Sequence, residues 1–96
     1  MKKLELVRSK KEKIVDIAAT YGISNIRTFG SVARDEDTYA SDLDLLIDLA
    51  PGRSALELGG FLVDLEELLH CRVDLVTEKG LNPLIKENVL KEVVNL

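Results

Sequence analysis

The sequence Gly-Ser-Val-Ala-Arg-Asp-Glu-Asp-Thr-Tyr-Ala-Ser-Asp-Leu-Asp occupies residues 30–44, between two runs rich in apolar residues, 26–29 and 45–47. A Gly-Ser pair after a strand predicts a tight turn, and the residues that follow predict a short helix. The unpaired N–H groups at the start of such a helix lie at its positive dipole end and favour an anion. Asp42 and Asp44 are two residues apart on the next predicted strand, so they point to the same face. A phosphate site beside paired carboxylates suggests the handling of a metal-bound nucleotide.

The composition is that of a small globular domain. The chain has 96 residues, of which 46% are hydrophobic and 31% are charged, and we expect residues 1–96 to form one domain. No run of about 18 apolar residues is present, so no membrane-spanning helix is expected. The single cysteine, Cys71, cannot form an internal disulfide, and the charged N-terminal residues do not resemble a secretory signal. Together these features favour the cytoplasm.

The charge is unevenly distributed along the chain. Residues 1–13 hold six basic and two acidic residues, a net charge of +4, which leaves −8 for the rest because the total is −4. An acidic body argues against direct nucleic-acid binding, since contacts to phosphates need cations. The basic segment is either a solvated helix face or a contact surface for an acidic partner or RNA.

Hydrophobic periodicity and turn residues predict an α+β fold with helices flanking a small sheet. The expected elements are a helix over residues 3–21, a strand over 26–29, a short helix over 31–35, a strand over 42–49, a helix from the Ser54 capping box, a strand over 72–77 and a helix from 83 to about 94. Gly59 and Gly60 lie inside the helix that follows Ser54 and each cost about 1 kcal/mol relative to alanine. A close approach of another backbone would explain these two glycines.

Three aspartates on predicted strands form the candidate catalytic and metal site. Asp is a poor strand former, yet Asp42 and Asp44 share a strand and Asp74 lies within another. If these two strands pair, the three carboxylates can converge, and a hard cation such as Mg²⁺ would relieve their repulsion. The alternative is that they only line an exposed sheet face. Asp48 shares that face, and we expect it to be solvated.

The remaining polar candidates have two interpretations each. Ser31 suits a helix cap and also a phosphate site, since both use the same geometry. Arg34, one turn further on, either meets a phosphate or braces an acidic loop. Ser41, directly before Asp42, suits a turn better than a ligand, and we keep it as a candidate nucleotide-binding residue. His70 and Cys71 are too few for a zinc site and are interpreted as structural.

The two motifs, Gly30-Ser31-x-Ala33-Arg34 and Ser41-Asp42-x-Asp44-Leu45, together resemble the signature of the DNA polymerase β-like nucleotidyltransferases. The chain is particularly similar to the minimal nucleotidyltransferases (MNT proteins), which pair with HEPN-domain toxins. The resemblance covers nearly the whole chain, and Asp74 matches the position of the family's third carboxylate. One departure is Asp35, because many members have glycine directly after the motif arginine.

The resemblance implies a nucleotidyltransferase fold, a nucleotide bound at Gly30 and Ser31, and Mg²⁺ held by three aspartates, of which Asp74 also helps to activate the attacking hydroxyl. The implied reaction is transfer of AMP from ATP to a tyrosine of a partner HEPN toxin, which makes the chain an antitoxin. An alternative is an antitoxin that acts by occlusion and has a vestigial nucleotidyl site. A small-molecule nucleotidyltransferase is a third possibility, for which a homo-oligomer could complete the substrate pocket.

Overall fold

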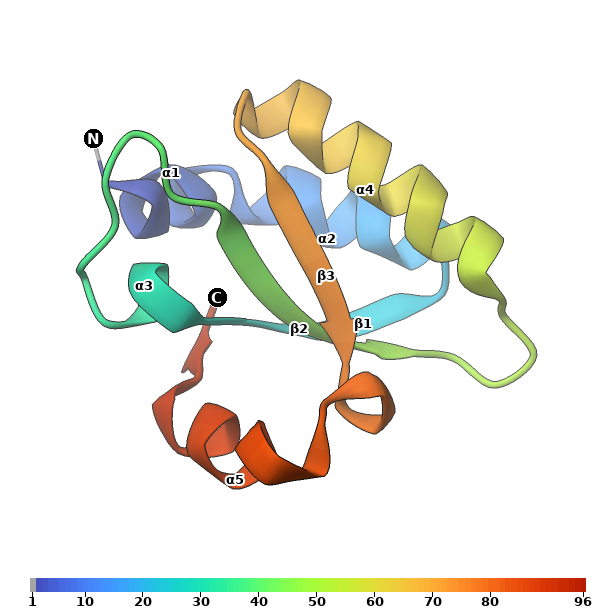
Figure 1. Ribbon diagram of the computed structural model, residues 1–96. Coiled ribbons are helices and arrows are strands. Elements are labelled where there is room, and N and C mark those ends of the chain that lie inside the picture. The colour runs from blue at the N-terminus through green and yellow to red at the C-terminus, as the bar shows by residue number, and fades with distance from the viewer. Residues whose placement is uncertain (1) are drawn as a thin grey trace.

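The computed structural model describes residues 2–96 and contains a four-stranded mixed sheet covered by helices on both faces (Figure 1). The strands are β1 (Ile23–Phe29), β2 (Leu43–Leu49), β3 (Val73–Thr77) and β4 (Val94–Asn95). The helices are α1 (Lys3–Ser9), α2 (Lys11–Thr20), α3 (Gly30–Ala33), α4 (Ala55–Leu69) and α5 (Pro83–Glu92), with a 3-10 turn η1 (Glu78–Gly80). The predicted α+β class is confirmed. Within residues 2–96, every helix is too short or too polar to span a bilayer.

The sheet order β3-β2-β1-β4 brings the two predicted aspartate-bearing strands together. Strands β2 and β3 are parallel, and Asp44 is the register partner of Asp74. Strands β1 and β2 are antiparallel, and Phe29 is the register partner of Asp44. Residues directly opposite each other in neighbouring strands project from the same face. The strand pairing that the convergence of the carboxylates required is therefore present.

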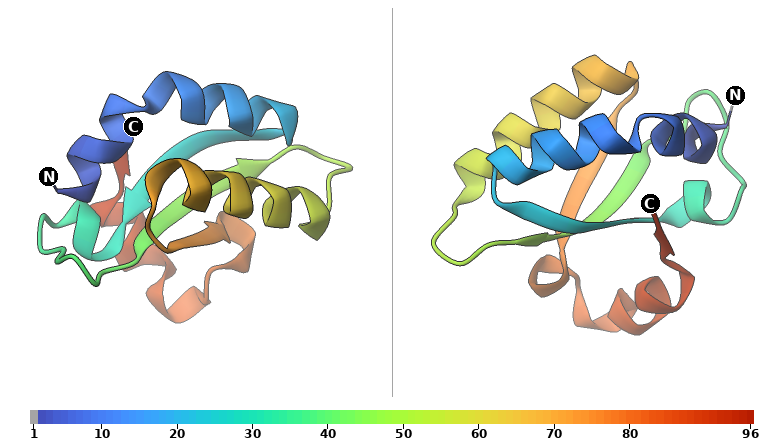
Figure 2. Two further views of the ribbon diagram at one scale, coloured as in Figure 1. Left: turned by 90° about the horizontal axis from the view of Figure 1, so that it is seen from above. Right: turned by 180° about the vertical axis from the view of Figure 1, so that it is seen from behind.

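The two faces of the sheet are covered to different extents (Figure 2). Helices α1, α2 and α4 lie over one face and bury Leu43, Leu45 and Ile47 of β2 in the main core. Helix α5 lies over the opposite face, where Leu46 packs with Leu81 and Val89. In the predicted strand over 42–49, Leu46 alternates onto the same face as Asp42, Asp44 and Asp48, yet its side chain is fully buried because α5 covers that part of the sheet.

The N-terminal segment forms two helices rather than the single predicted helix. The break is at Lys10, whose φ of −113° and ψ of 18° lie outside the helical region and whose N–H bonds to the carbonyl of Val7 at 3.1 Å. This residue adjoins Lys11, the one polar residue in the series at three- and four-residue spacing that is otherwise formed by Leu4, Val7, Ile14, Ala18 and Tyr21. The break lets α1 bury Val7 and α2 bury Ile14 against the same core.

Two errors in the predicted strands have clear causes. Strand β1 begins at Ile23, three residues earlier than predicted, because Ile23 and Ser24 already pair with β2 and are followed by a bulge at Asn25 and Ile26, where the register shifts. Asn25 has a φ of +51° there, and turns and bulges favour the same residue types. Helix α5 ends at Glu92, and the chain then forms β4, which pairs with β1 over only two residues. So short a strand leaves no alternating pattern in the sequence.

The capping box at Ser54 is present as predicted, with Glu57 bonded to the Ser54 N–H. The presence of glycine at positions 59 and 60 of α4 is not explained by a close backbone, as was expected. A Cβ at Gly60 would come within 2.6 Å of the Tyr21 ring, whereas a Cβ at Gly59 would meet nothing within 4 Å. The close neighbour is thus a side chain and not a backbone, and it concerns only one of the two glycines.

Candidate active site

The turn at Gly30 lies against the candidate carboxylates because β1 ends beside the start of β2. Gly30 follows Phe29, the register partner of Asp44. Its φ is +73°, a conformation that L side chains rarely adopt, and a Cβ there would overlap a carboxylate oxygen of Asp44. Glycine is therefore required at this position both by the backbone and by the neighbouring acid.

The acidic groups around Asp44 influence one another through their charges. Partial burial, followed by the charges of Asp74 and Asp42, raises the pKa of Asp44 from its ordinary value of 3.8 to about 6. The carboxylates lie near one another, but they do not form a complete metal site. Over residues 2–96, no group of three or more Asp, Glu, His or Cys side chains is arranged to hold an ion. A cation placed among them would remove the repulsion that raises this pKa.

Asp42 was predicted to begin the strand over residues 42–49, but β2 begins at Leu43, so Asp42 lies one residue before it. Its carboxylate is half-exposed and forms an ion pair with the exposed Arg72 at 3.7 Å. Surface pairs of this length contribute little to stability. Asp42 is thus held loosely, and its carboxylate is free to reorient toward a cation.

The predicted phosphate-binding groups are directed at a carboxylate. The Gly30 N–H donates a hydrogen bond to Glu92 Oε1 at 3.0 Å, and Arg34 Nη1 donates to Glu92 Oε2 at 3.1 Å. Arg34 Nε also donates to Glu36 at 3.4 Å. Arg34 therefore pairs with acidic side chains in this structure, which is the second of its two predicted roles. The donors remain suited to phosphate, since carboxylate and phosphate accept the same hydrogen bonds.

Ser31 does not cap α3 as predicted. Phe29 occupies the N-cap position, and no side chain caps this helix. The helix starts one residue earlier than expected because the Gly30 carbonyl accepts the N–H of Arg34 at 3.2 Å. Ser31 is partly buried and follows Gly30 in the first turn.

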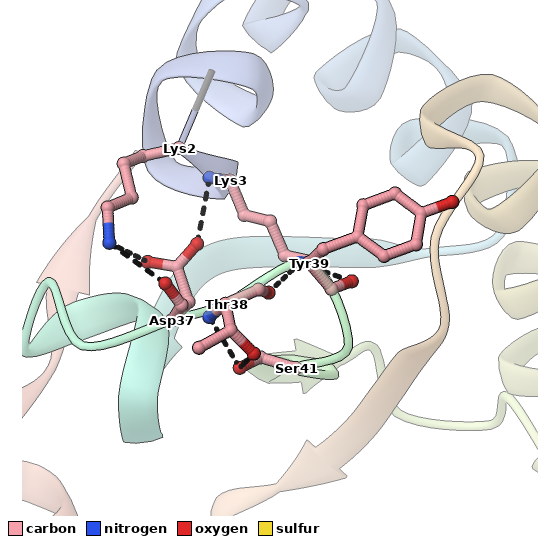
Figure 3. A network of polar contacts seen from close by, with 6 residues as sticks. All are labelled: Lys2, Lys3, Asp37, Thr38, Tyr39 and Ser41. Carbon is pink, nitrogen blue, oxygen red and sulfur yellow. Dashed lines mark hydrogen bonds and ion pairs between the residues drawn. The ribbon is translucent and has the colours of Figure 1, made fainter.

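The loop from Arg34 to Asp42 is attached to the start of α1 (Figure 3). Asp37 is buried, and its Oδ2 accepts the backbone N–H of Lys3 at 3.2 Å. The buried Lys3 donates in turn from Nζ to the carbonyls of Thr38 at 2.8 Å and Tyr39 at 3.4 Å. These bonds anchor the segment that joins the Gly30 turn to the aspartates.

Ser41 forms the turn at the end of this loop. Its Oγ accepts the Thr38 N–H at 2.8 Å, which is the turn-forming role that its sequence position suggested. As a nucleotide-binding residue it remains a prediction. Next to it is a hollow of about 680 Å³ bordered by Lys2, Asp42 and Arg72, among others. This volume falls within the range of small-molecule sites.

Asp35, the departure from the family motif, adopts a φ of +57°. Glycine reaches this left-handed region without strain, and aspartate tolerates it better than most residues. The backbone shape of a glycine at this position is therefore retained, while the side chain adds a negative charge near the Gly30 turn.

Other polar residues mentioned above lie outside this cluster. Asp48 is exposed, as expected, and its carboxylate is also paired with the buried Arg27 at 2.9 Å. His70 caps the end of α4 with a φ of +54°, in keeping with a structural role, and Cys71 follows it directly.

Glu92 is a residue of the site that was not predicted from the sequence. Nothing in a predicted surface helix signals a contact to a turn 62 residues away.

Comparisons with known proteins agree with this arrangement. A family model described as "Nucleotidyltransferase domain" matches residues 8–96. Among curated proteins, "Putative protein adenylyltransferase MJ0435" of Methanocaldococcus jannaschii is 37% identical over 86 residues, covering 90% of this chain and 92% of that protein. "Protein adenylyltransferase MntA" of Thermococcus cleftensis is 38% identical over 79 residues, covering 82% of this chain and 80% of that one.

Solved structures share the fold as well. A structure described as "putative minimal nucleotidyltransferase" superposes with a TM-score of 0.86 at 43% identity, covering 97% of this chain and 95% of that chain. A crystal structure described as a toxin-antitoxin with AMP-PNP superposes with a TM-score of 0.72 at 20% identity, covering 88% of this chain and 69% of that chain. At that identity the likeness concerns the fold alone.

Proposed function

The chain belongs to the nucleotidyltransferase domain family and is thus a transferase, and we propose that it moves AMP from ATP to a tyrosine hydroxyl of a HEPN-domain toxin, which it thereby silences. The observation that carries the proposal is the register pairing of Asp44 with Asp74, directly beside the Gly30 turn. This arrangement supports a phosphate site and an acidic site within reach of one nucleotide.

The carboxylates of Asp42, Asp44 and Asp74 are proposed to hold Mg²⁺. The residue types fit this ion, because carboxylate oxygens are its preferred ligands and Asp44 is the register partner of Asp74. When bound, the ion would neutralise charge on the phosphates. The Gly30 N–H, Ser31 and Arg34 are proposed to orient the phosphates, with Ser41 at the edge of the nucleotide site.

The proposed reaction is an in-line displacement at the α-phosphorus of ATP. The acceptor hydroxyl oxygen bonds to this phosphorus, the bond to the bridging oxygen of the β-phosphate breaks, and pyrophosphate leaves. Asp74 is proposed to take the hydroxyl proton, as a general base within reach of the acceptor. Holding both reactants in this geometry is the main contribution that the chain can make.

A protein acceptor is supported by the relatives. Two of them, at 37% and 38% identity, have names that describe protein adenylyltransferases. A structure with the same fold is described as a toxin-antitoxin with AMP-PNP. A hollow of about 680 Å³ lies beside Asp42, and Gly30, Asp44 and Asp74 lie outside its lining. We therefore propose that the acceptor side chain comes from a partner and that partner binding and catalysis are linked.

The test is transfer of label to the partner. The purified chain is incubated with Mg²⁺, α-³²P-labelled ATP and a HEPN-domain toxin, and the toxin is analysed by autoradiography and intact mass. The expected result is one or more AMP additions on the toxin, and their loss in Asp42→Asn and Asp44→Asn. Asp16→Asn, an exposed change on α2, is the matched control and should transfer AMP normally.

Two outcomes contradict the proposal. Label from γ-³²P-labelled ATP in place of α-label would indicate transfer of a phosphoryl group and not of AMP. An unlabelled toxin that is still neutralised by the chain and by Asp42→Asn alike would favour occlusion without catalysis.

A further inference from the structure

The carboxylate of Glu92 occupies the position where the proposed function requires nucleotide phosphate. It accepts one hydrogen bond from the Gly30 N–H at 3.0 Å and one from Arg34 Nη1 at 3.1 Å. These are two of the donors assigned to the phosphates. Glu92 ends α5, so it reaches the site from the helix layer that covers this face of the sheet.

The preferences of α5 itself do not explain the position of Glu92. An acidic side chain in the last turn of a helix faces the negative end of the dipole, which is unfavourable. Its side chain is only 29% exposed, and partial burial of a carboxylate adds a further cost unless the group is paired. The bonds to Gly30 and Arg34 are the contacts that offset both costs, and they are charge-assisted.

Glu92 also adds a negative charge to a region that is already acidic. Its charge is one of those that act on Asp44. An incoming triphosphate, itself strongly anionic, would meet this carboxylate at the donors it needs. The Glu92 carboxylate and a nucleotide phosphate cannot accept the same hydrogen bonds from the Gly30 N–H and Arg34 at the same time. Binding of one at these donors therefore excludes the other.

We infer that Glu92 is an internal occupant of the phosphate site and sets the affinity of the chain for nucleotide. This inference rests on the proposed function and adds a residue to it. Nucleotide binding must displace Glu92 from Gly30 and Arg34. If Glu92 holds the donors in about nine of ten molecules, the apparent Kd for ATP is about tenfold higher than that of the free site.

The experiment measures binding and not turnover. The Kd for ATP with Mg²⁺ is determined by isothermal titration calorimetry, without toxin, for the full chain and for Glu92→Gln and Glu92→Ala. The matched control is Glu36→Gln, which removes one charge from the same Arg34 but leaves the Gly30 N–H bond untouched. Far-ultraviolet circular dichroism and a melting curve confirm that each variant is folded.

The expected result is binding about tenfold tighter in both Glu92 variants and within twofold of the unchanged chain in Glu36→Gln. Equal affinity in the Glu92 variants and the unchanged chain would overturn the inference but leave the proposed function standing. Weaker binding would also overturn it, because Glu92 would then support the site. An equal gain in ATP affinity in Glu36→Gln would also overturn the inference, because the loss of a negative charge near Arg34 would then be enough to explain it. Absence of ATP binding in every protein would overturn the proposed function together with the inference.

Discussion

Replacing Asp44 by asparagine removes a charge that the folded chain holds at a cost. Burial and the charges of Asp74 and Asp42 raise the pKa of Asp44 from 3.8 to about 6. Asparagine has nearly the same shape and no charge. We therefore expect Asp44→Asn to raise the free energy of unfolding of the metal-free protein at pH 7.5, although the same change should abolish AMP transfer.

The sign and size follow from proton linkage. A carboxyl whose pKa is higher in the folded than in the unfolded state stabilises the fold below pH 4, and this contribution is lost as pH rises through about 6. The full difference in pKa corresponds to about 3 kcal/mol. Because Asp44 is only partly buried, solvent screening reduces the expected gain in Asp44→Asn to about 1 kcal/mol.

The assay is urea unfolding followed by circular dichroism at pH 4.0, 5.0, 6.0 and 7.5 in EDTA. Each pH compares Asp44→Asn with the unchanged chain, so that the titration of other groups cancels. The difference should be near zero at pH 4.0 and largest at pH 7.5. Added Mg²⁺ should then stabilise the unchanged chain more than the variant, because a ligand of the folded state raises its stability.

Two results would refute this reasoning. A variant less stable than the unchanged chain at pH 7.5 would mean that Asp44 makes a favourable contact which asparagine loses. A difference that does not change between pH 4.0 and 7.5 would mean that the acidic groups do not share a repulsive field. Asp16→Asn, exposed on α2, should show no pH-dependent difference in the same experiment.

Four further changes can be measured by urea unfolding at pH 7.5. Gly60→Ala should lower stability by about 1–2 kcal/mol because its methyl group meets the Tyr21 ring. Gly59→Ala, in open space, should raise stability by about 0.5–1 kcal/mol; equal effects of the two would refute the contact. Ser54→Ala should cost about 1 kcal/mol through loss of the capping box, and no loss would mean that the box does not hold in solution. Asp35→Gly should raise stability by up to about 1 kcal/mol by relieving the left-handed backbone, and a lower stability would show that the aspartate side chain contributes contacts.

Local signals predicted the elements that depend on neighbouring residues. The capping box of Ser54 marked the start of α4, and the helix predicted from residue 83 does begin at Pro83, after an N-cap at Asn82. The errors were at positions where one residue type suits two structures, such as the bulge at Asn25. The motif at Gly30 correctly placed a turn between a strand and a short helix, although the cap at Ser31 was wrong.

What the amino-acid sequence determined by itself is the fold class, the strand that carries Asp44 and the family, since these depend on periodicity and on a motif of fixed spacing. What only the tertiary structure decided is the pairing of distant groups. Glu92 bonds to the Gly30 turn, Tyr21 packs against Gly60, and α5 buries Leu46. The physical reason is that such contacts form only when packed elements bring distant side chains together. The residues next to each partner in the sequence carry no signal that identifies the other partner.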